Sequence, residues 1–192
     1  MKNNEYKWVL LMYSLPLKPS RQRVSIWRTL QKIGSVALKK SVYILPYNTD
    51  LYERFQWLSQ EIKSMNGEAT LVKVHSIENM NDSEIRESFN KARDEEYILT
   101  IQACSRLSDK LGRIKGDNGE ITSLKLEAKK IGERLEEIKH IDFFGASRQT
   151  EAIKHYRLCL KKLDKLSKES TKTPVTKKPT AETLNKIGRA HV

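Results

Sequence analysis

Acidic residues are missing from a long N-terminal stretch of this 192-residue chain. No aspartate or glutamate occurs between Glu5 and Asp50, although lysines and arginines are frequent there. A segment that carries only positive charge favours an anionic partner, and a nucleic-acid backbone is the commonest large one. Residues 81–160, by contrast, carry 15 basic and 15 acidic side chains, which is typical of a solvated helical surface with many ion pairs.

Cysteine and long apolar runs are scarce as well. Cys104 and Cys159 lie far apart and show neither a CxxC motif nor a Cys–His spacing, so we expect two core thiols in a reducing cytoplasm. No run approaches the roughly 20 apolar residues that span a bilayer. The apolar run after Lys7 ends at Pro16 without a cleavage site, so no signal peptide is predicted. These absences favour a cytoplasmic protein without a membrane partner.

Catalytic motifs are also missing. The sequence contains no G-x-S-x-G, no glycine-rich phosphate loop and no H-E-x-x-H. His75, His140 and His155 share no i, i+4 spacing, and surface or boundary positions explain them better than metal ligation. We therefore expect a protein that is not an enzyme and has neither a cofactor nor a metal site.

Residues 1–78 show the pattern of a ferredoxin-like α+β domain. The expected elements are a strand at 8–13, a helix at 21–33, a β-rich segment at 36–45, a helix at 50–65 and a strand at 69–74. The β-rich segment fits two short strands, or one strand with a bulge at its lysines. The resulting order, βαββαβ, places both helices on one face of an antiparallel sheet. The other face is most simply closed by a second copy of the chain, which predicts a homodimer.

Helix ends and core faces can also be predicted within this domain. Ser20 is the expected N-cap of the first helix, and Asp50 with Glu53 marks the expected start of the second. Trp27 and Phe55 are expected in the core. In the first helix, apolar residues at every third position predict one buried stripe of Val24, Trp27, Leu30 and Ile33.

The basic residues of the acid-free stretch form the candidate binding site. Three of them share a second stripe on the first helix, and two follow in the β-rich segment. The candidate residues for contact with nucleic-acid phosphates, or with another anion, are Lys18, Arg21, Arg23, Arg28, Lys32, Lys39 and Lys40. The alternative is an ordinary solvated surface on a non-catalytic structural or dimerisation module.

Residues 82–168 read as three amphipathic helices, arranged as an antiparallel hairpin or a small bundle. A turn is expected at 116–119, and the loop at 142–146, with sequence D-F-F-G-A, carries two large apolar side chains that must pack somewhere. Residues 169–186 are rich in Lys, Thr and Pro and predict a linker or disordered tail. Residues 187–192 back-translate to a common sequencing adapter, so we interpret them as read-through and expect the natural protein to continue beyond Lys186.

The N-terminal half resembles a known family in the run W-V-L-L-M-Y-S-L-P-x-K-P-S-R-x-R-V-x-I-W-R, in the following Q-K-I-G-S-V-A-L-K-K-S-V-Y-I-L-P and in the later D-F-F-G-A. Over roughly residues 7–165 the chain resembles the N-terminal domain of the chromate-resistance protein ChrB family. The resemblance implies a DNA-binding transcription regulator that controls a chromate-efflux operon and responds to chromate. Full-length members carry a further C-terminal domain, and residues 169–186 would occupy the position of the interdomain linker.

A more distant similarity is to the Cas2-like ferredoxin fold, including the middle domain of PaaX-type repressors. The similarity rests on the strand, turn, Arg-rich helix and glycine, and on the S-V-Y signature at 41–43. Nuclease members of that fold hold a divalent metal with an acidic residue near the end of the first strand. Residues 12–15 read M-Y-S-L here, without a carboxylate, so nuclease activity is not expected.

Overall fold

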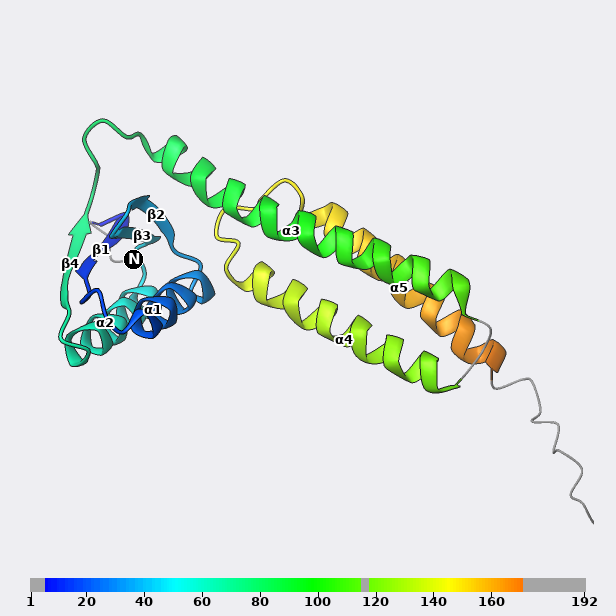
Figure 1. Ribbon diagram of the computed structural model, residues 1–192. Helices are drawn as coiled ribbons and strands as arrows, with labels where there is room; N and C mark the ends of the chain where they lie inside the picture. The colour runs from blue at the N-terminus through cyan, green and yellow to red at the C-terminus, as the bar shows by residue number, and fades with distance from the viewer. Residues whose placement is uncertain (1–5, 115–117, 171–192) are drawn as a thin grey trace, which may run out of the picture.

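The chain forms two parts, a four-stranded sheet with two helices and a set of three long helices (Figure 1). The computed structural model describes residues 6–114 and 118–170. In chain order the elements are β1 (Trp8–Ser14), α1 (Ser20–Lys32), β2 (Val36–Lys39), β3 (Val42–Pro46), α2 (Thr49–Ser64), β4 (Glu68–Val74), α3 (Asp82–Arg113), α4 (Asn118–His140) and α5 (Gln149–Ser170). This order confirms the predicted α+β fold, a ferredoxin-like βαββαβ unit followed by a helical part.

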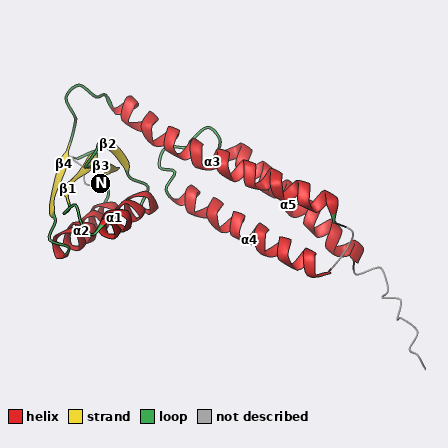
Figure 2. Cartoon of the chain, in the orientation of Figure 1, coloured by secondary structure: helices red, strands yellow, loops and turns green. Residues whose placement is uncertain are grey.

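β1 is a central strand, as its apolar sequence predicts. The strand order is β2-β3-β1-β4, and every neighbouring pair is antiparallel. Leu10 lies opposite Ile44 of β3 and opposite Val72 of β4, so apolar side chains form a row across the sheet. α1 and α2 cover one face of this sheet (Figure 2). Leu11 of β1 and Phe55 of α2 are fully buried, which confirms the expected core position of Phe55.

The buried side of α1 differs from the prediction. Ile26 and Leu30 are the buried residues of the helix, and Ile33 follows directly after its end. The prediction that Val24 and Trp27 face the core is wrong, because Val24 is 43% exposed and Trp27 is 51% exposed. The reason is the helical period. At 3.6 residues per turn, positions 26, 30 and 33 stay on one line, whereas a repeat of three drifts around the helix.

The first turns of α1 and α2 are also capped differently from the prediction. The N-cap of α1 is Pro19, and no side chain caps this helix. The N-cap of α2 is Asn48, whose side-chain oxygen accepts a hydrogen bond from the backbone N–H of Leu51 at 2.7 Å. Ser20 and Asp50 therefore lie inside the first turns and do not cap them. A short polar side chain on an extended residue just before the helix reaches the free N–H groups better than one within it.

β2 and β3 form a hairpin. It combines the two predicted alternatives for this segment, two short strands and a bulge near the lysines. β2 and β3 are two separate strands, and the pairing register shifts between Ala37 and Lys39. Gly34 separates α1 from β2 and has a φ of +80°, which confirms the predicted stop after the helix. A Cβ atom at Gly34 would lie 2.7 Å from the Cβ atom of Ile141, so a glycine is also needed here for the close approach of the loop after α4.

The three long helices pack into a bundle and so decide between the two predicted arrangements. At the end of the bundle away from the sheet part (Figure 1), the three helices share a core. It contains Leu107, Leu111, Leu124, Ala128, Ile131 and Leu163. Cys104 and Cys159 are free thiols buried between α3 and α5, and the Cys159 thiol donates to the carbonyl oxygen of Cys104 at 3.1 Å. Burial raises the pKa of Cys104 to about 12. Both cysteines are thus core residues, as predicted.

The loop between α4 and α5 is held in shape by Asp142. Its Oδ1 atom accepts hydrogen bonds from the backbone N–H groups of Gly145 and Ala146, at 3.0 and 2.9 Å. Its Oδ2 atom accepts from the hydroxyl of Tyr97 at 3.1 Å and from the side-chain amide of Gln149 at 3.0 Å. One carboxylate therefore joins this loop to α3 and to the start of α5.

The two phenylalanines of this loop attach the bundle to the sheet part. Phe143 and Phe144 both pack edge-on against Phe89 of α3, with ring centroids 5.9 and 5.4 Å away. Phe144 also contacts Trp8 of β1. The chain itself therefore closes one end of the sheet face opposite α1 and α2. Met12, on the same face as Trp8, remains 37% exposed, and the prediction that a second copy closes this face stays a prediction.

Three predicted segments fall partly or wholly outside the described residues. Of the expected turn at 116–119, positions 118 and 119 belong to α4. The expected linker starts at 169, although α5 runs to Ser170, and its remainder lies outside the described part. The segment interpreted as adapter read-through, 187–192, lies outside it entirely.

Candidate nucleic-acid interface

The acid-free stretch folds into one continuous unit, β1, α1, β2 and β3. All seven predicted site residues belong to it. Lys18 lies in the loop before α1, Lys39 ends β2 and Lys40 lies in the following turn, and the remaining four, Arg21, Arg23, Arg28 and Lys32, are residues of α1.

Four of the seven gather at one end of the sheet. β1 and β2 both run antiparallel to β3 and so end on the same side. The backbone N–H of Tyr13 donates to the carbonyl oxygen of Ser41 at 3.0 Å, which places the β2–β3 turn beside the end of β1. The loop before α1 starts at this same end. The residues brought together in this way are Lys18, Arg21, Lys39 and Lys40.

Arg28 and Lys32 extend the positive surface along α1. They follow Arg21 at helical spacings of seven and eleven residues, and all three side chains are exposed. A helix of 13 residues is about 20 Å long, so Lys32 lies near the opposite end of the sheet from Arg21. The basic surface is therefore a row along α1 with a cluster at its N-terminal end.

Arg23 has a structural role that the sequence did not indicate. One guanidinium nitrogen donates to the carbonyl oxygen of Leu17 at 2.6 Å and to that of Pro16 at 3.3 Å. These bonds fasten the proline-rich loop to the first turn of α1. Arg23 thus holds Lys18 and the start of the helix in place, and it is less available for a ligand than the other six.

The other six basic side chains are exposed. Within residues 6–114 and 118–170, none of them forms an ion pair with a carboxylate. Some cations of the bundle do find such partners. Lys110 of α3, for example, lies 2.8 Å from Glu127 of α4. The positive charge of the six side chains is therefore not neutralised by a carboxylate of the described residues.

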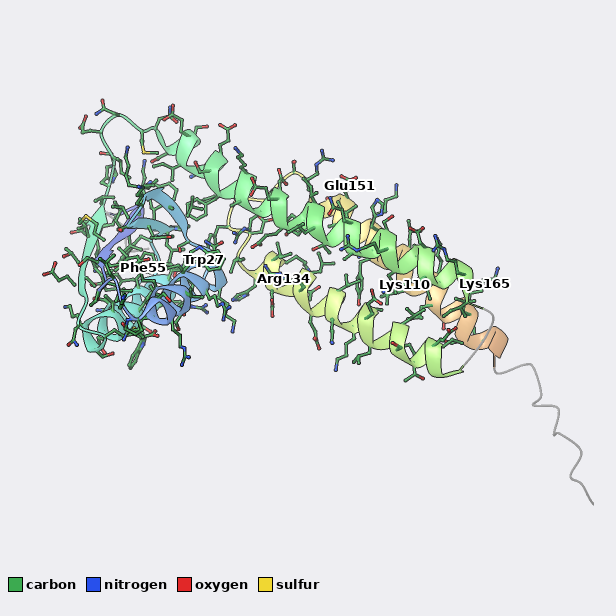
Figure 3. All side chains as sticks on the ribbon, in the orientation of Figure 1. Trp27, Phe55, Lys110, Arg134, Glu151 and Lys165 are labelled. Carbon is green, nitrogen blue, oxygen red and sulfur yellow. The ribbon has the colours of Figure 1, made fainter. Side chains whose placement is uncertain are left out.

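Trp27 joins this surface although we expected it in the core. Figure 3 shows it at the border of the sheet part, near the junction with the bundle, whereas Phe55 lies inside that part. Val24, one turn before it, is exposed as well. The sequence contained a signal for this arrangement, because Ile26, Leu30 and Ile33 form a better helical stripe than a repeat of three.

Trp57 of α2 is a second exposed tryptophan, at 72%. Its helical neighbours four residues away on either side are Glu53 and Glu61, so its surroundings include negative charge. It therefore lies outside the acid-free unit, in a different electrostatic setting from Trp27.

Side chains that could ligate a metal ion do not cluster in the described part of the chain. Among those residues, no group of three or more His, Cys, Asp or Glu side chains could hold a metal ion. β1 ends at Ser14, without a carboxylate where the nuclease pattern requires one.

Among residues 6–114 and 118–170, no helix combines the length and the apolar character needed to cross a bilayer.

Comparison with known proteins identifies the family. The family model described as Protein ChrB, N-terminal, matches residues 23–174. The chain belongs to the ChrB N-terminal family. Protein ChrB from Cupriavidus metallidurans is 28% identical over 142 residues, which are 73% of this chain and 41% of that relative. The chain thus spans less than half the length of this ChrB protein. No solved structure matches the chain.

The ChrB match confirms the resemblance expected from the sequence. It contains five of the seven predicted site residues and all three helices of the bundle, while Lys18 and Arg21 precede it. The match therefore runs from α1 through the rest of the sheet part and the whole bundle, whereas β1 precedes it. The contacts of Phe143 and Phe144 with the sheet part are the junction between the two parts.

Proposed function

We propose that this chain is the N-terminal module of a chromate-responsive transcriptional regulator, that it binds operator DNA through the unit from β1 to β3, and that it has no catalytic activity. Membership of the ChrB family supports a role related to chromate resistance. The observation that carries the DNA-binding proposal is the set of six exposed basic side chains without carboxylate partners in the described part of the chain. Such a surface attracts a polyanion over a distance of about a Debye length.

Phosphate contacts should dominate the affinity of this surface. Each phosphate that a lysine or arginine neutralises releases condensed counterions, so the affinity falls steeply with salt. These contacts position a protein on DNA without reading its sequence. We propose that operator selection comes from the geometry of a homodimer, which would present two copies of the basic row at a fixed spacing.

The proposal is tested by binding of the whole chain to the DNA upstream of its own gene, measured by fluorescence anisotropy across a salt series. Binding should weaken with salt. The triple substitution Arg21→Ala, Arg28→Ala and Lys32→Ala should lower the slope of log K against log salt by about 1 per lost phosphate contact. Arg23 is left intact because it holds the loop before α1.

A matched control removes the same charge from the bundle. Lys125, Arg157 and Lys161 are exposed, and none of them forms a described ion pair. Their triple replacement by alanine should leave the salt slope unchanged. Equal effects of the two triple variants would mean that only net charge matters, and the site assignment would then be wrong.

Adding chromate to the same titration tests the effector. Relief of DNA binding by chromate would place sensing within this chain. DNA binding that ignores chromate would refute sensing by this chain and leave the DNA contact intact.

A dimerisation module is the second candidate function. It is favoured by the sheet face that the chain covers only at its Trp8 end and leaves open around Met12. Absence of DNA binding at moderate salt, together with a dimer in sedimentation equilibrium, would support this function over the first.

A further inference from the structure

An exposed apolar patch lies in the middle of the basic surface. It consists of Val24 and Trp27 on the outer side of α1. On a helix, Val24 neighbours Arg21 three residues before it, Trp27 three residues after it and Arg28 four residues after it. Val24 therefore adjoins both arginines. Trp27 lies beside Val24 and continues the exposed apolar surface around the helix, toward Arg23 four residues before it.

The patch lies outside the core clusters of the described residues. Trp27 is not part of the described core clusters, whereas Trp8, at 3% exposed, is buried against Phe89 and Phe144. A half-exposed indole keeps a large apolar area in water, which binding to a flat apolar surface would remove. Aromatic residues and arginine are also the side chains that are enriched at binding contacts.

The charge around the patch selects the kind of partner. No acidic residue occurs between Tyr6 and Thr49, and Arg21 and Arg28 flank the patch. An apolar contact framed by unpaired guanidinium groups fits a ligand that offers flat rings beside phosphates. Nucleic acid has both, because the bases lie next to the sugar–phosphate backbone.

We propose that Trp27, supported by Val24, stacks on a base of the DNA that α1 binds, at a step that opens or kinks to admit the indole. This inference rests on the proposed DNA binding and adds a base contact to it. Apolar side chains that insert at a base step unstack it and bend the duplex. Trp27 would then contribute what the basic row lacks, a preference for DNA steps that deform easily.

Trp57 supplies a matched control within the same protein. It is more exposed than Trp27 and lies on the neighbouring helix α2, but Glu53 and Glu61 flank it. An effect of exposed tryptophan in general would appear in both positions. A stacking contact on the basic face would appear only at Trp27.

The experiment uses tryptophan fluorescence and the full chain. In a Trp57→Phe variant, Trp27 is the one exposed indole, because Trp8 is buried and the sequence contains three tryptophans. Addition of the upstream DNA should quench its emission. Trp27→Ala should weaken DNA binding roughly 10-fold with an unchanged salt slope, since no phosphate contact is lost. Trp27→Phe should retain most of the affinity, and Trp57→Ala all of it.

DNA bending provides an independent readout. Donor and acceptor dyes at the two ends of the duplex should approach when the parent protein binds, and less so with Trp27→Ala. Unchanged affinity, emission and bending would overturn the stacking contact while the proposed DNA binding stands. A lowered salt slope for Trp27→Ala would overturn it too, because the loss would then be one of phosphate contacts. A parent protein that does not bind DNA would overturn the proposed function itself, and quenching by an acidic protein in place of DNA would identify a protein partner.

Discussion

In the bundle many basic side chains are neutralised within the fold, whereas on the outer face of α1 they meet solvent without partners. Arg134 of α4 lies 3.1 Å from Glu96 and 3.0 Å from Glu137, and Arg148 lies 2.7 Å from Glu151. Among the described residues, no such pair involves the six exposed candidate residues Lys18, Arg21, Arg28, Lys32, Lys39 and Lys40.

This difference teaches where to look for function in the molecule. Surface ion pairs contribute at most about 1 kcal/mol each, so leaving the α1 cations unpaired costs little stability. The absence of carboxylate neighbours preserves the positive electrostatic potential that these side chains produce at a distance, which such neighbours would cancel. The bundle thus pairs part of its charge within the fold, whereas the acid-free unit of the sheet part presents unpaired positive charge.

The sharpest test of the comparison contrasts the core of the sheet part with its outer surface. Phe55→Ala should destabilise the protein by about 3–5 kcal/mol, because the ring is fully buried between α2 and the sheet. Trp27→Ala should cost at most about 1 kcal/mol, since the indole is half exposed. Urea unfolding measures both. Similar losses for the two variants would return Trp27 to the core.

A second test addresses the loop between α4 and α5, which carries the two phenylalanines of the junction. Asp142→Ala should destabilise the protein by about 1–3 kcal/mol, because the N–H groups of Gly145 and Ala146 lose their acceptor. The matched control is Asp164→Ala, which removes an exposed ion pair with Lys168 and should cost less than about 0.5 kcal/mol. Equal urea midpoints for the two variants would show that the Asp142 carboxylate does not hold the loop.

The smallest expected effect concerns the ion pair between the two parts and its pH dependence. Hydrogen bonds from Lys7 at 2.7 Å and from the Trp8 indole at 3.0 Å lower the pKa of Asp82. The stabilisation is therefore complete above the usual aspartate pKa of about 4 and is lost as the pH falls through the lowered value. Because both ionic groups are partly exposed, it should reach at most about 1 kcal/mol.

Urea unfolding of the parent and of Asp82→Asn at pH 7 and pH 3 checks the sign of this effect. The difference between the two proteins should be larger at pH 7. A difference that is the same at both pH values would mean that ionised Asp82 does not contribute to stability.

The limits of sequence reasoning are clearest in α1 and in the D-F-F-G-A loop. The boundaries of α1 were predictable to within a residue because Pro19 and Gly34 restrict the backbone on either side of it. Its rotation was predicted wrongly: the helical period favours Ile26, Leu30 and Ile33, but Val24 and Trp27 are also apolar, and packing on the sheet decides which of these side chains are buried. The loop was predictable as a place where two phenylalanines must be buried, but their contact with Phe89 and Trp8 joins residues far apart in the sequence.

The sequence alone determined the order of strands and helices, the position of positive charge along the chain and the family. These depend on local periodicity, on backbone restrictions at proline and glycine, and on residue identity, all of which act over a few neighbouring positions. Tertiary structure alone decided that Arg23 holds a loop while Arg21 and Arg28 face solvent, and that Trp27 lies among them. Those outcomes depend on which helix face the sheet buries. That choice is a competition between apolar surfaces that only the folded arrangement resolves.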